Sequence, residues 1–142
     1  HFRANATNLL STEFLDLAKQ HLNPHGVLFF NTTDSRRVQR TACLAFRYGA
    51  RFTNHMVVSQ APIAFNYERW RSVLQNYSID GEPLFNASKA EETSKLKELM
   101  DNYGPESSSI EHCPTLLQQT AGKAAVTDDN MGTEWRYYFA LE

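Results

Sequence analysis

The run Val27–Phe30 limits the fold of this chain more than any other feature. Its letters, VLFF, contain no polar residue; turn-forming residues precede it at 23–26, and polar residues follow it at 31–35. An apolar run without polar alternation is typical of a strand buried on both faces, as in a parallel sheet covered by helices. We therefore expect residues 27–30 to form a central strand.

Helical patterns flank this run on both sides. Ser11 can cap a helix that continues to Leu22 and whose apolar residues recur at helical spacing. After the run, residues 31–35 offer several cap oxygens, and apolar residues at helical spacing continue up to Gly49. This helix–strand–helix order indicates an α/β fold, and the helical tract over 66–102 makes helix the majority.

The remaining segments predict a small sheet and further helices. Residues 51–53 and 56–59 have a strand-forming composition, as either two short strands or one bent strand. A helix is expected from Asn66, a surface helix over 88–102 and a short helix from Cys113. Residues 135–139 (WRYYF) are expected to join 27–30 and 50–59 in the sheet.

Length, composition and charge favour a single domain over residues 1–142. Hydrophobic residues make up 42% of the 142 residues, which is enough for one core. The net charge is −2 and the basic residues are scattered, so a nucleic-acid surface is disfavoured. The apolar runs fall far short of the roughly 20 residues that cross a bilayer, so we expect no membrane contact by this chain.

Cysteine usage points to a reducing compartment. Cys43 and Cys113 are too few for a disulfide framework, and no secretory signal pattern is visible. We therefore expect two free thiols in the cytoplasm. Sequons for N-glycosylation matter only in secreted eukaryotic proteins and are interpreted as chance; they occur at Asn5, Asn31, Asn76 and Asn86.

Motifs for metals and cofactors are missing from the sequence. No Gly-rich phosphate loop follows any strand. His21 and His25 are separated by Pro24, which breaks the helix that would place both imidazoles on one face. His112 and Cys113 have no further residues at metal-ligand spacing. We expect neither a metal nor a cofactor in this chain.

Three polar clusters remain as candidate sites, and each has a simpler structural explanation. Residues 31–34 follow the apolar run, where ligands bind in open α/β sheets, although capping of the next helix accounts for the same residue types. Asp128 and Asp129, with Glu134, surround a turn and could equally hold the C-terminal segment against the sheet. The polar residues of 1–8 could be the lead-in to the first helix. The candidate residues are His1, Arg3, Asn5, Asn8, Asn31, Thr32, Thr33, Asp34, Asp128 and Asp129.

Several phrases occur in an order that resembles the C-terminal half of spermidine-synthase-like proteins, above all the bacterial versions fused to membrane-spanning segments. These phrases are HFRANATNLLS (1–11), EFL (13–15), HLNPHGV (21–27), NTT (31–33) and TDD (127–129). The resemblance implies the C-terminal half of a Rossmann-like S-adenosylmethionine-methyltransferase fold. In such a fold the Gly-rich loop, the ribose-binding acid and the catalytic Asp would precede His1. Decarboxylated S-adenosylmethionine, or S-adenosylmethionine, would then be the cofactor of the parent protein.

The resemblance also implies roles for particular residues. Residues 1–10 match a loop that closes over the substrates, and 86–142 would be a C-terminal extension. Residues 31–33 occupy the place of a Gln-Gly-Glu-type phrase near the amine substrate, so Asp34 is the nearby residue that could offer a negative charge to an ammonium. Residues 52–55 (FTNH) stand where the family has a Pro-Thr-Tyr-Pro phrase.

Two functions follow as expectations. In the first, the chain is the substrate-side portion of an aminopropyltransferase for a polyamine or another small amine and is inactive alone, because transfer also needs the upstream base and cofactor site. Its parent would be cytoplasmic, or membrane-anchored with this domain on the cytoplasmic side. In the second, the chain is a non-catalytic interaction module that forms a homo-oligomer through a bare sheet edge.

Overall fold

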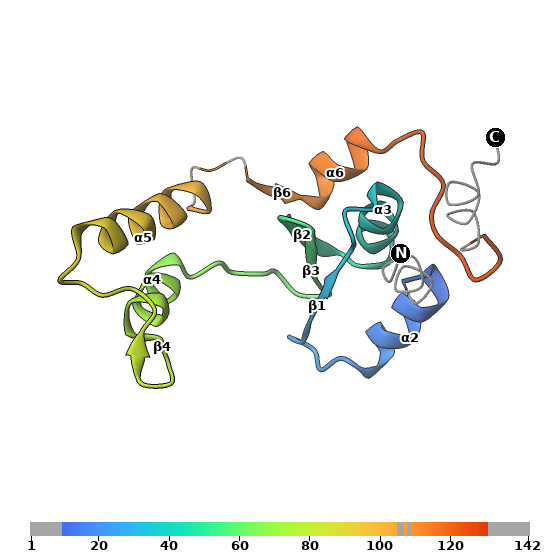
Figure 1. Cartoon of the computed structure of the whole chain (residues 1–142). Helices are drawn as coiled ribbons and strands as arrows, with labels where there is room; N and C mark the ends of the chain where they lie inside the picture. Colours follow the sequence, from blue (N-terminus) through green and yellow to red (C-terminus); the bar gives the residue numbers. More distant parts are fainter. Residues whose placement is uncertain (1–9, 105–106, 108, 131–142) are drawn as a thin grey trace. The chain divides into compact units, whose positions relative to one another are not determined.

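A computed structural model of the chain describes residues 10–104, 107 and 109–130. The chain divides into two compact units, one of residues 1–63 with 111–142 and one of residues 64–110. The expected single domain over 1–142 stays a prediction. Within the described residues the fold is mixed α/β, with five helices, a four-stranded sheet and a two-stranded sheet (Figure 1).

The first unit contains the larger sheet and the helices that cover it. Its strands lie in the order β1-β3-β2-β6, and β3 pairs antiparallel with both β1 and β2. β1 and β2 therefore run in the same direction. The elements are α2 (Thr12–His21), β1 (Val27–Asn31), α3 (Arg36–Ala45), β2 (Tyr48–Phe52), β3 (His55–Ser59), β6 (Ile110–His112) and α6 (Cys113–Gln119). The first residue of β6, Ile110, belongs to the second unit.

Serine caps fix the start of both N-terminal helices; the sequence predicted Ser11 and offered Ser35 as one of several cap oxygens over 31–35. The side chain of Ser11 accepts a hydrogen bond from the Phe14 N–H at 3.1 Å, and α2 begins at the next residue. The side chain of Ser35 accepts from the Val38 N–H at 3.4 Å, and α3 begins at Arg36. Each cap satisfies one of the backbone donors that a helix start leaves unpaired.

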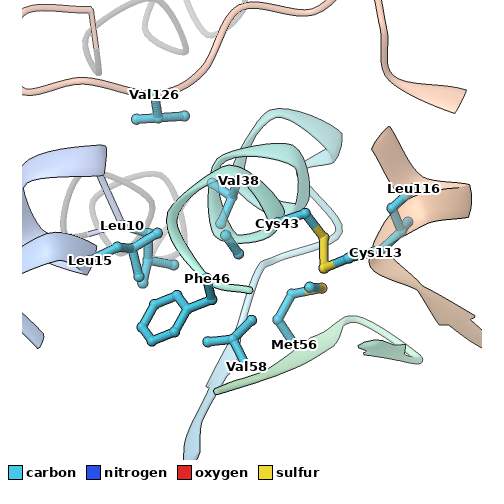
Figure 2. Close-up of a cluster of buried hydrophobic side chains, with 11 residues drawn as sticks. Leu10, Leu15, Val38, Cys43, Phe46, Met56, Val58, Cys113, Leu116 and Val126 are labelled. Atoms are coloured by element: carbon cyan, nitrogen blue, oxygen red, sulfur yellow. A yellow bond between two sulfur atoms is a disulfide. The ribbon is translucent and has the colours of Figure 1, made fainter. Parts of the chain in front are cut away.

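The core lies between one face of the sheet and α3, which packs between α2 and α6 (Figures 1 and 2). Val38 and Ala42 lie one turn apart on α3 and are fully buried, so they form the apolar stripe that faces the sheet. The other buried apolar residues of this cluster are Leu10, Leu15, Cys43, Phe46, Met56, Val58, Cys113, Leu116 and Val126.

The position of β1 differs from the sequence expectation. In the part of the chain that the structure describes, β1 pairs with β3 alone and forms an edge of the sheet, so the prediction of a central strand in a parallel sheet was wrong. Val27 is 53% exposed and Phe29 58% exposed, whereas Leu28 and Phe30 pack against the core. The difference arises because β3 folds back between β1 and β2, an arrangement that depends on pairing distant in sequence.

The two-strand alternative for residues 50–59 is correct, but the helix before it is shorter than expected. α3 ends at Ala45, and Gly49 lies inside β2 instead of ending a helix. A Cβ at Gly49 would lie 2.7 Å from the Cys113 sulfur and 2.9 Å from a Val58 methyl. Glycine is therefore required there by the close approach of α6 and β3.

The two cysteines form a disulfide, which corrects the prediction of free thiols. The bond joins Cys43 on α3 to Cys113 at the start of α6, across 70 residues of sequence (Figure 2). Both side chains lie in the buried cluster with Met56 and Leu116. Sequence spacing alone could not reveal the pair, because their proximity results from the packing of α3 against α6.

The second unit consists of two helices and a short hairpin. α4 (Tyr67–Asn76) is capped by Asn66, whose side chain accepts from the Arg69 N–H at 2.9 Å. β4 (Ser78–Ile79) and β5 (Glu82–Pro83) form a hairpin around Asp80 and Gly81, and α5 (Ala90–Asn102) follows. Leu96 and Met100 are the buried residues of α5, one turn apart, as its narrow apolar stripe predicted. None of the helices in the described ranges is long and apolar enough to cross a membrane.

Candidate functional site

Two loops meet at one end of the larger sheet and form the candidate site. Because β1 and β2 run in the same direction on either side of β3, their carboxyl ends lie together, and Asn31 and Phe52 both pair with His55. The loop over 32–35 follows β1, and the turn over 53–54 follows β2. The carboxyl ends of co-directional strands are where α/β sheets bind ligands.

The backbone of the first loop adopts an unusual conformation. Thr33 and Asp34 have φ values of 50° and 63°, in the left-handed region that residues other than glycine rarely adopt. Asn31 stabilises this conformation, because its side-chain oxygen accepts from the Thr33 N–H at 2.7 Å. Rare backbone conformations of this kind cluster at functional sites, where the surrounding structure stabilises them.

Thr32 fastens the first loop to the second. Its side chain is fully buried, and both its N–H and its hydroxyl donate to the Asn54 carbonyl at 2.7 Å. Gln39 of α3, also fully buried, donates from Nε2 to the Thr32 hydroxyl oxygen at 3.2 Å and to Asp34 at 3.5 Å. This network fixes the base of the loop and leaves Asp34 at its exposed tip.

The charges around the site are paired. Arg51 of β2 forms ion pairs with Asp34 at 3.3 Å and with Glu111 of β6 at 2.5 Å, and Arg36 of α3 lies 3.4 Å from the same Glu111 oxygen. The Asp34 side chain is 70% exposed, whereas those of Arg51 and Glu111 are 20% and 15% exposed. Two arginines and two acids give the group no net charge.

Glu111 is the acid of this group with a clearly shifted pKa. Burial raises the pKa of the Glu111 carboxyl, but the positive charges of Arg51 and Arg36 and a hydrogen bond from Gln119 outweigh burial. The net effect is a pKa below the ordinary value of 4.5. Glu111 is therefore held as a carboxylate, and its ion pair with Arg51 holds the guanidinium in place.

An aromatic pair lies at this end of the sheet on the face opposite Arg51, because Arg51 pairs with Met56 and successive strand residues point to opposite faces. The rings of Phe29 and His55 stack in parallel with centroids 5.0 Å apart and an interplanar angle of 2°. The His55 Nδ1 lies 3.4 Å from the hydroxyl of Thr53, which also has a left-handed φ of 53°. Residues 52–55 thus contribute an imidazole beside the exposed Phe29 ring.

Asp128 and Asp129 lie on a separate segment, over 124–130, that crosses α2 and α3. The Val126 N–H donates to the buried Thr41 hydroxyl at 2.8 Å, and the Val126 carbonyl accepts from Thr12. The Asp128 N–H donates to Glu13 at 3.1 Å. The contacts that join this segment to α2 and α3 come from Val126, from the Asp128 backbone and from the Asn130 side chain. None of these bonds is made by the carboxylate of Asp128 or Asp129, so the role of the two acids stays a prediction.

The remaining predicted residues cannot be placed. His1, Arg3, Asn5, Asn8 and Glu134 lie outside the described residues, as do residues 135–139 of the expected strand. The described part of the chain begins at Leu10, which is buried in the core together with Leu15.

The described residues contain neither a Gly-rich phosphate loop nor a cluster of metal ligands. The loop after β1 contains no glycine, and the glycines at 26, 49, 81, 104 and 122 are too far apart to form a phosphate-binding turn. Within residues 10–104, 107 and 109–130, no three His, Cys, Asp or Glu side chains gather as metal ligands. The chemistry of the site is therefore that of a carboxylate, an arginine, hydroxyls and an imidazole.

Comparison with known protein families, curated proteins and solved structures found no match. The candidate site thus rests on geometry and on the sequence phrases.

Sequence reasoning identified one half of this site and missed the other. The residues of the loop after β1 were predicted from their place after an apolar run. The missed residues lie on strands or helices, where side-chain partners depend on register, or in the turn after β2. They are Gln39, Arg51, His55 and Glu111 on the elements and Asn54 in the turn. The one local signal for them was the turn-forming Asn54-His55 between two strand-forming segments.

Proposed function

We propose that this chain provides the amine-binding side of a spermidine-synthase-like aminopropyltransferase. The observation that carries the proposal is the exposed carboxylate of Asp34, which a buried network holds at the carboxyl ends of two co-directional strands. A carboxylate in this position can accept charge-assisted hydrogen bonds from an ammonium group. The Gln39 side-chain amide and the Arg51 guanidinium are the polar groups next to this carboxylate.

The topology supports the Rossmann-like fold that the resemblance implies. β1, α3 and β2 form a strand–helix–strand unit with co-directional strands, the unit from which α/β sheets are built. β1 has exposed apolar side chains, and among the described residues no strand pairs with its outer edge. Both features fit a strand that continues into a larger sheet. Both features are consistent with the C-terminal half of a Rossmann-like methyltransferase fold.

The proposed role is limited to holding the acceptor amine. Transfer of an aminopropyl group requires a base that takes the proton from the attacking amine, and the resemblance assigns that base and the S-adenosylmethionine-type cofactor to other parts of the parent. We therefore expect no release of methylthioadenosine when the chain is given a diamine and decarboxylated S-adenosylmethionine.

The disulfide bears on the expected cytoplasmic location. Disulfides persist mainly in oxidising compartments, whereas the cytoplasm keeps most thiols reduced. The bond between Cys43 and Cys113 therefore favours an oxidising compartment over the cytoplasm.

The binding role can be tested by titrating the isotope-labelled chain with 1,4-diaminobutane and following backbone amides by NMR. We expect shifts at residues 31–35 and 53–55, and we expect Asp34→Asn to abolish them. The uncharged 1,4-butanediol is the matched control ligand and should leave these amides unmoved. Shifts that are unchanged in Asp34→Asn would contradict the proposal.

A second candidate function is an interaction module that associates through β1. The specific observation is that, among the described residues, no strand pairs with the outer edge of β1, which has exposed Val27 and Phe29 and neither charge nor proline. Sedimentation velocity would show self-association that Phe29→Lys removes. A strict monomer at all concentrations would contradict this second function and leave the first intact.

A further inference from the structure

We propose that Arg51 determines which amines the site accepts, disfavouring a simple diamine and favouring an amine that carries its own carboxylate. The inference rests on the proposed function, because it names the substrate class of the same site. It starts from the way Arg51 lies between two acids, Asp34 at the exposed tip of the loop and Glu111 beneath it.

Arg51 is held in place more firmly than Asp34. Glu111 lies 2.5 Å from Nε of Arg51, and both side chains are largely buried. Asp34 is mostly exposed and contacts Arg51 through NH1 at the longer distance of 3.3 Å. A ligand can therefore separate Asp34 from Arg51 at little cost, whereas Arg51 stays anchored to Glu111.

This arrangement presents a positive and a negative group side by side. A dication that approaches Asp34 must displace a guanidinium that remains within a few ångströms and repels it. A zwitterionic head group meets no such penalty, because its ammonium can pair with Asp34 while its carboxylate pairs with Arg51. Arginine suits the second contact, since its guanidinium offers several N–H donors in a planar fork that matches a carboxylate.

Arg36 provides an internal comparison. It lies 3.4 Å from the same Glu111 oxygen and 3.3 Å from the Gln39 side-chain oxygen, whereas the ion-pair partner of Asp34 is Arg51. Arg36 carries the same charge and shares the same buried acid. Its removal should alter the net charge of the site but not the pairing of Asp34.

Ornithine and 1,4-diaminobutane form a matched pair of probes, since they differ by one carboxylate. We expect the chain to bind ornithine about threefold more tightly than 1,4-diaminobutane, an effect of the size of one exposed ion pair. In Arg51→Met the preference should reverse, with tighter binding of 1,4-diaminobutane and weaker binding of ornithine. Arg36→Met should retain the preference for ornithine.

Loss of Arg51 leaves Glu111 with one ion-pair partner fewer, so the single variant could fail to fold. The double variant Arg51→Met/Glu111→Gln removes that charge as well, with Glu111→Gln alone as its control. We expect the double variant to prefer 1,4-diaminobutane and Glu111→Gln to prefer ornithine.

The titrations, read at the amides of residues 31–35, separate the two proposals. A preference for 1,4-diaminobutane in the unmodified chain, or a preference that Arg51→Met and the double variant leave unchanged, would overturn the role of Arg51 while the amine site stands. The absence of binding by either probe in every variant would overturn the amine site and, with it, this inference.

Discussion

Thr32 donates two hydrogen bonds to Asn54, one from its backbone N–H and one from its hydroxyl, both at 2.7 Å. These bonds join the loop after β1 to the turn after β2, so that residues 22 positions apart in sequence form one surface. The hydroxyl oxygen also accepts from the buried Gln39 side chain at 3.2 Å. Thr32 is therefore the residue that holds the two halves of the candidate site together.

Replacement of Thr32 by valine should destabilise the chain. The substitution keeps the shape of the side chain but leaves the buried Gln39 amide without one acceptor, and an unsatisfied buried polar group costs about 1–3 kcal/mol. Urea unfolding of Thr32→Val measures this loss. Thr53→Val is the matched control: its hydroxyl is exposed, and we expect its free energy of unfolding to change by less than about 0.5 kcal/mol. Equal losses in the two variants would contradict the structural role of Thr32.

Reduction of the disulfide should lower stability substantially. Cys43 and Cys113 close a loop of 70 residues, for which the chain-entropy relation gives about 4 kcal/mol. We expect the urea midpoint to fall when dithiothreitol is added. The variant Cys43→Ser should already unfold at the lower midpoint and should not respond to dithiothreitol. An unmodified chain that unfolds identically with and without reductant would show that the bond does not form.

The stability that Glu111 contributes should depend on acid pH. Its pKa in the folded chain lies below the ordinary value of 4.5, because Arg51 and Arg36 favour the carboxylate more strongly than burial disfavours it. The contribution is therefore complete above about pH 4.5 and is lost as the pH falls through the lower, folded-state pKa. Urea unfolding between pH 3 and pH 7 should show a difference between the unmodified chain and Glu111→Gln that shrinks toward acid pH.

Glu92 is the control for this prediction. Its pKa is also lowered, chiefly by the hydrogen bond from Lys89, but Glu92 lies on a helix surface in the other unit. Glu92→Gln should change the pH dependence far less than Glu111→Gln. A difference for Glu111→Gln that grows as the pH falls would have the wrong sign and would contradict the account.

The sequence predicted local features of the fold better than pairings between distant segments. Ser11 and Asn66 identified helix starts because a cap acts over three residues, and each makes the expected bond. Among the several cap oxygens offered by 31–35, the structure selects Ser35. The place of Val27–Phe30 in the sheet was predicted wrongly: the apolar run indicated a strand buried on both faces, but β1 lies at an edge with Val27 and Phe29 exposed. The same limit hid the disulfide, whose cysteines meet only when α3 packs on α6.

The candidate site shows the same difference between local features and pairings of distant segments. Asp34 could be predicted from its place after a strand, since that inference needs only the order of elements. Arg51 and Glu111 could not, because their contact depends on β2 and β6 lying side by side in a sheet whose order is β1-β3-β2-β6. The ion pair between Arg51 and Asp34 therefore became visible only in three dimensions.

The central claim is that an amine binds beside Asp34, and an amine that carries a spin label tests it most directly. With 4-amino-TEMPO we predict paramagnetic broadening of the amides of residues 31–35 and 53–55, lost in Asp34→Asn and absent with the neutral 4-hydroxy-TEMPO. Equal or stronger broadening along α5, where Glu91 and Asp101 are exposed on the surface, would show only nonspecific attraction to acids and would contradict the claim.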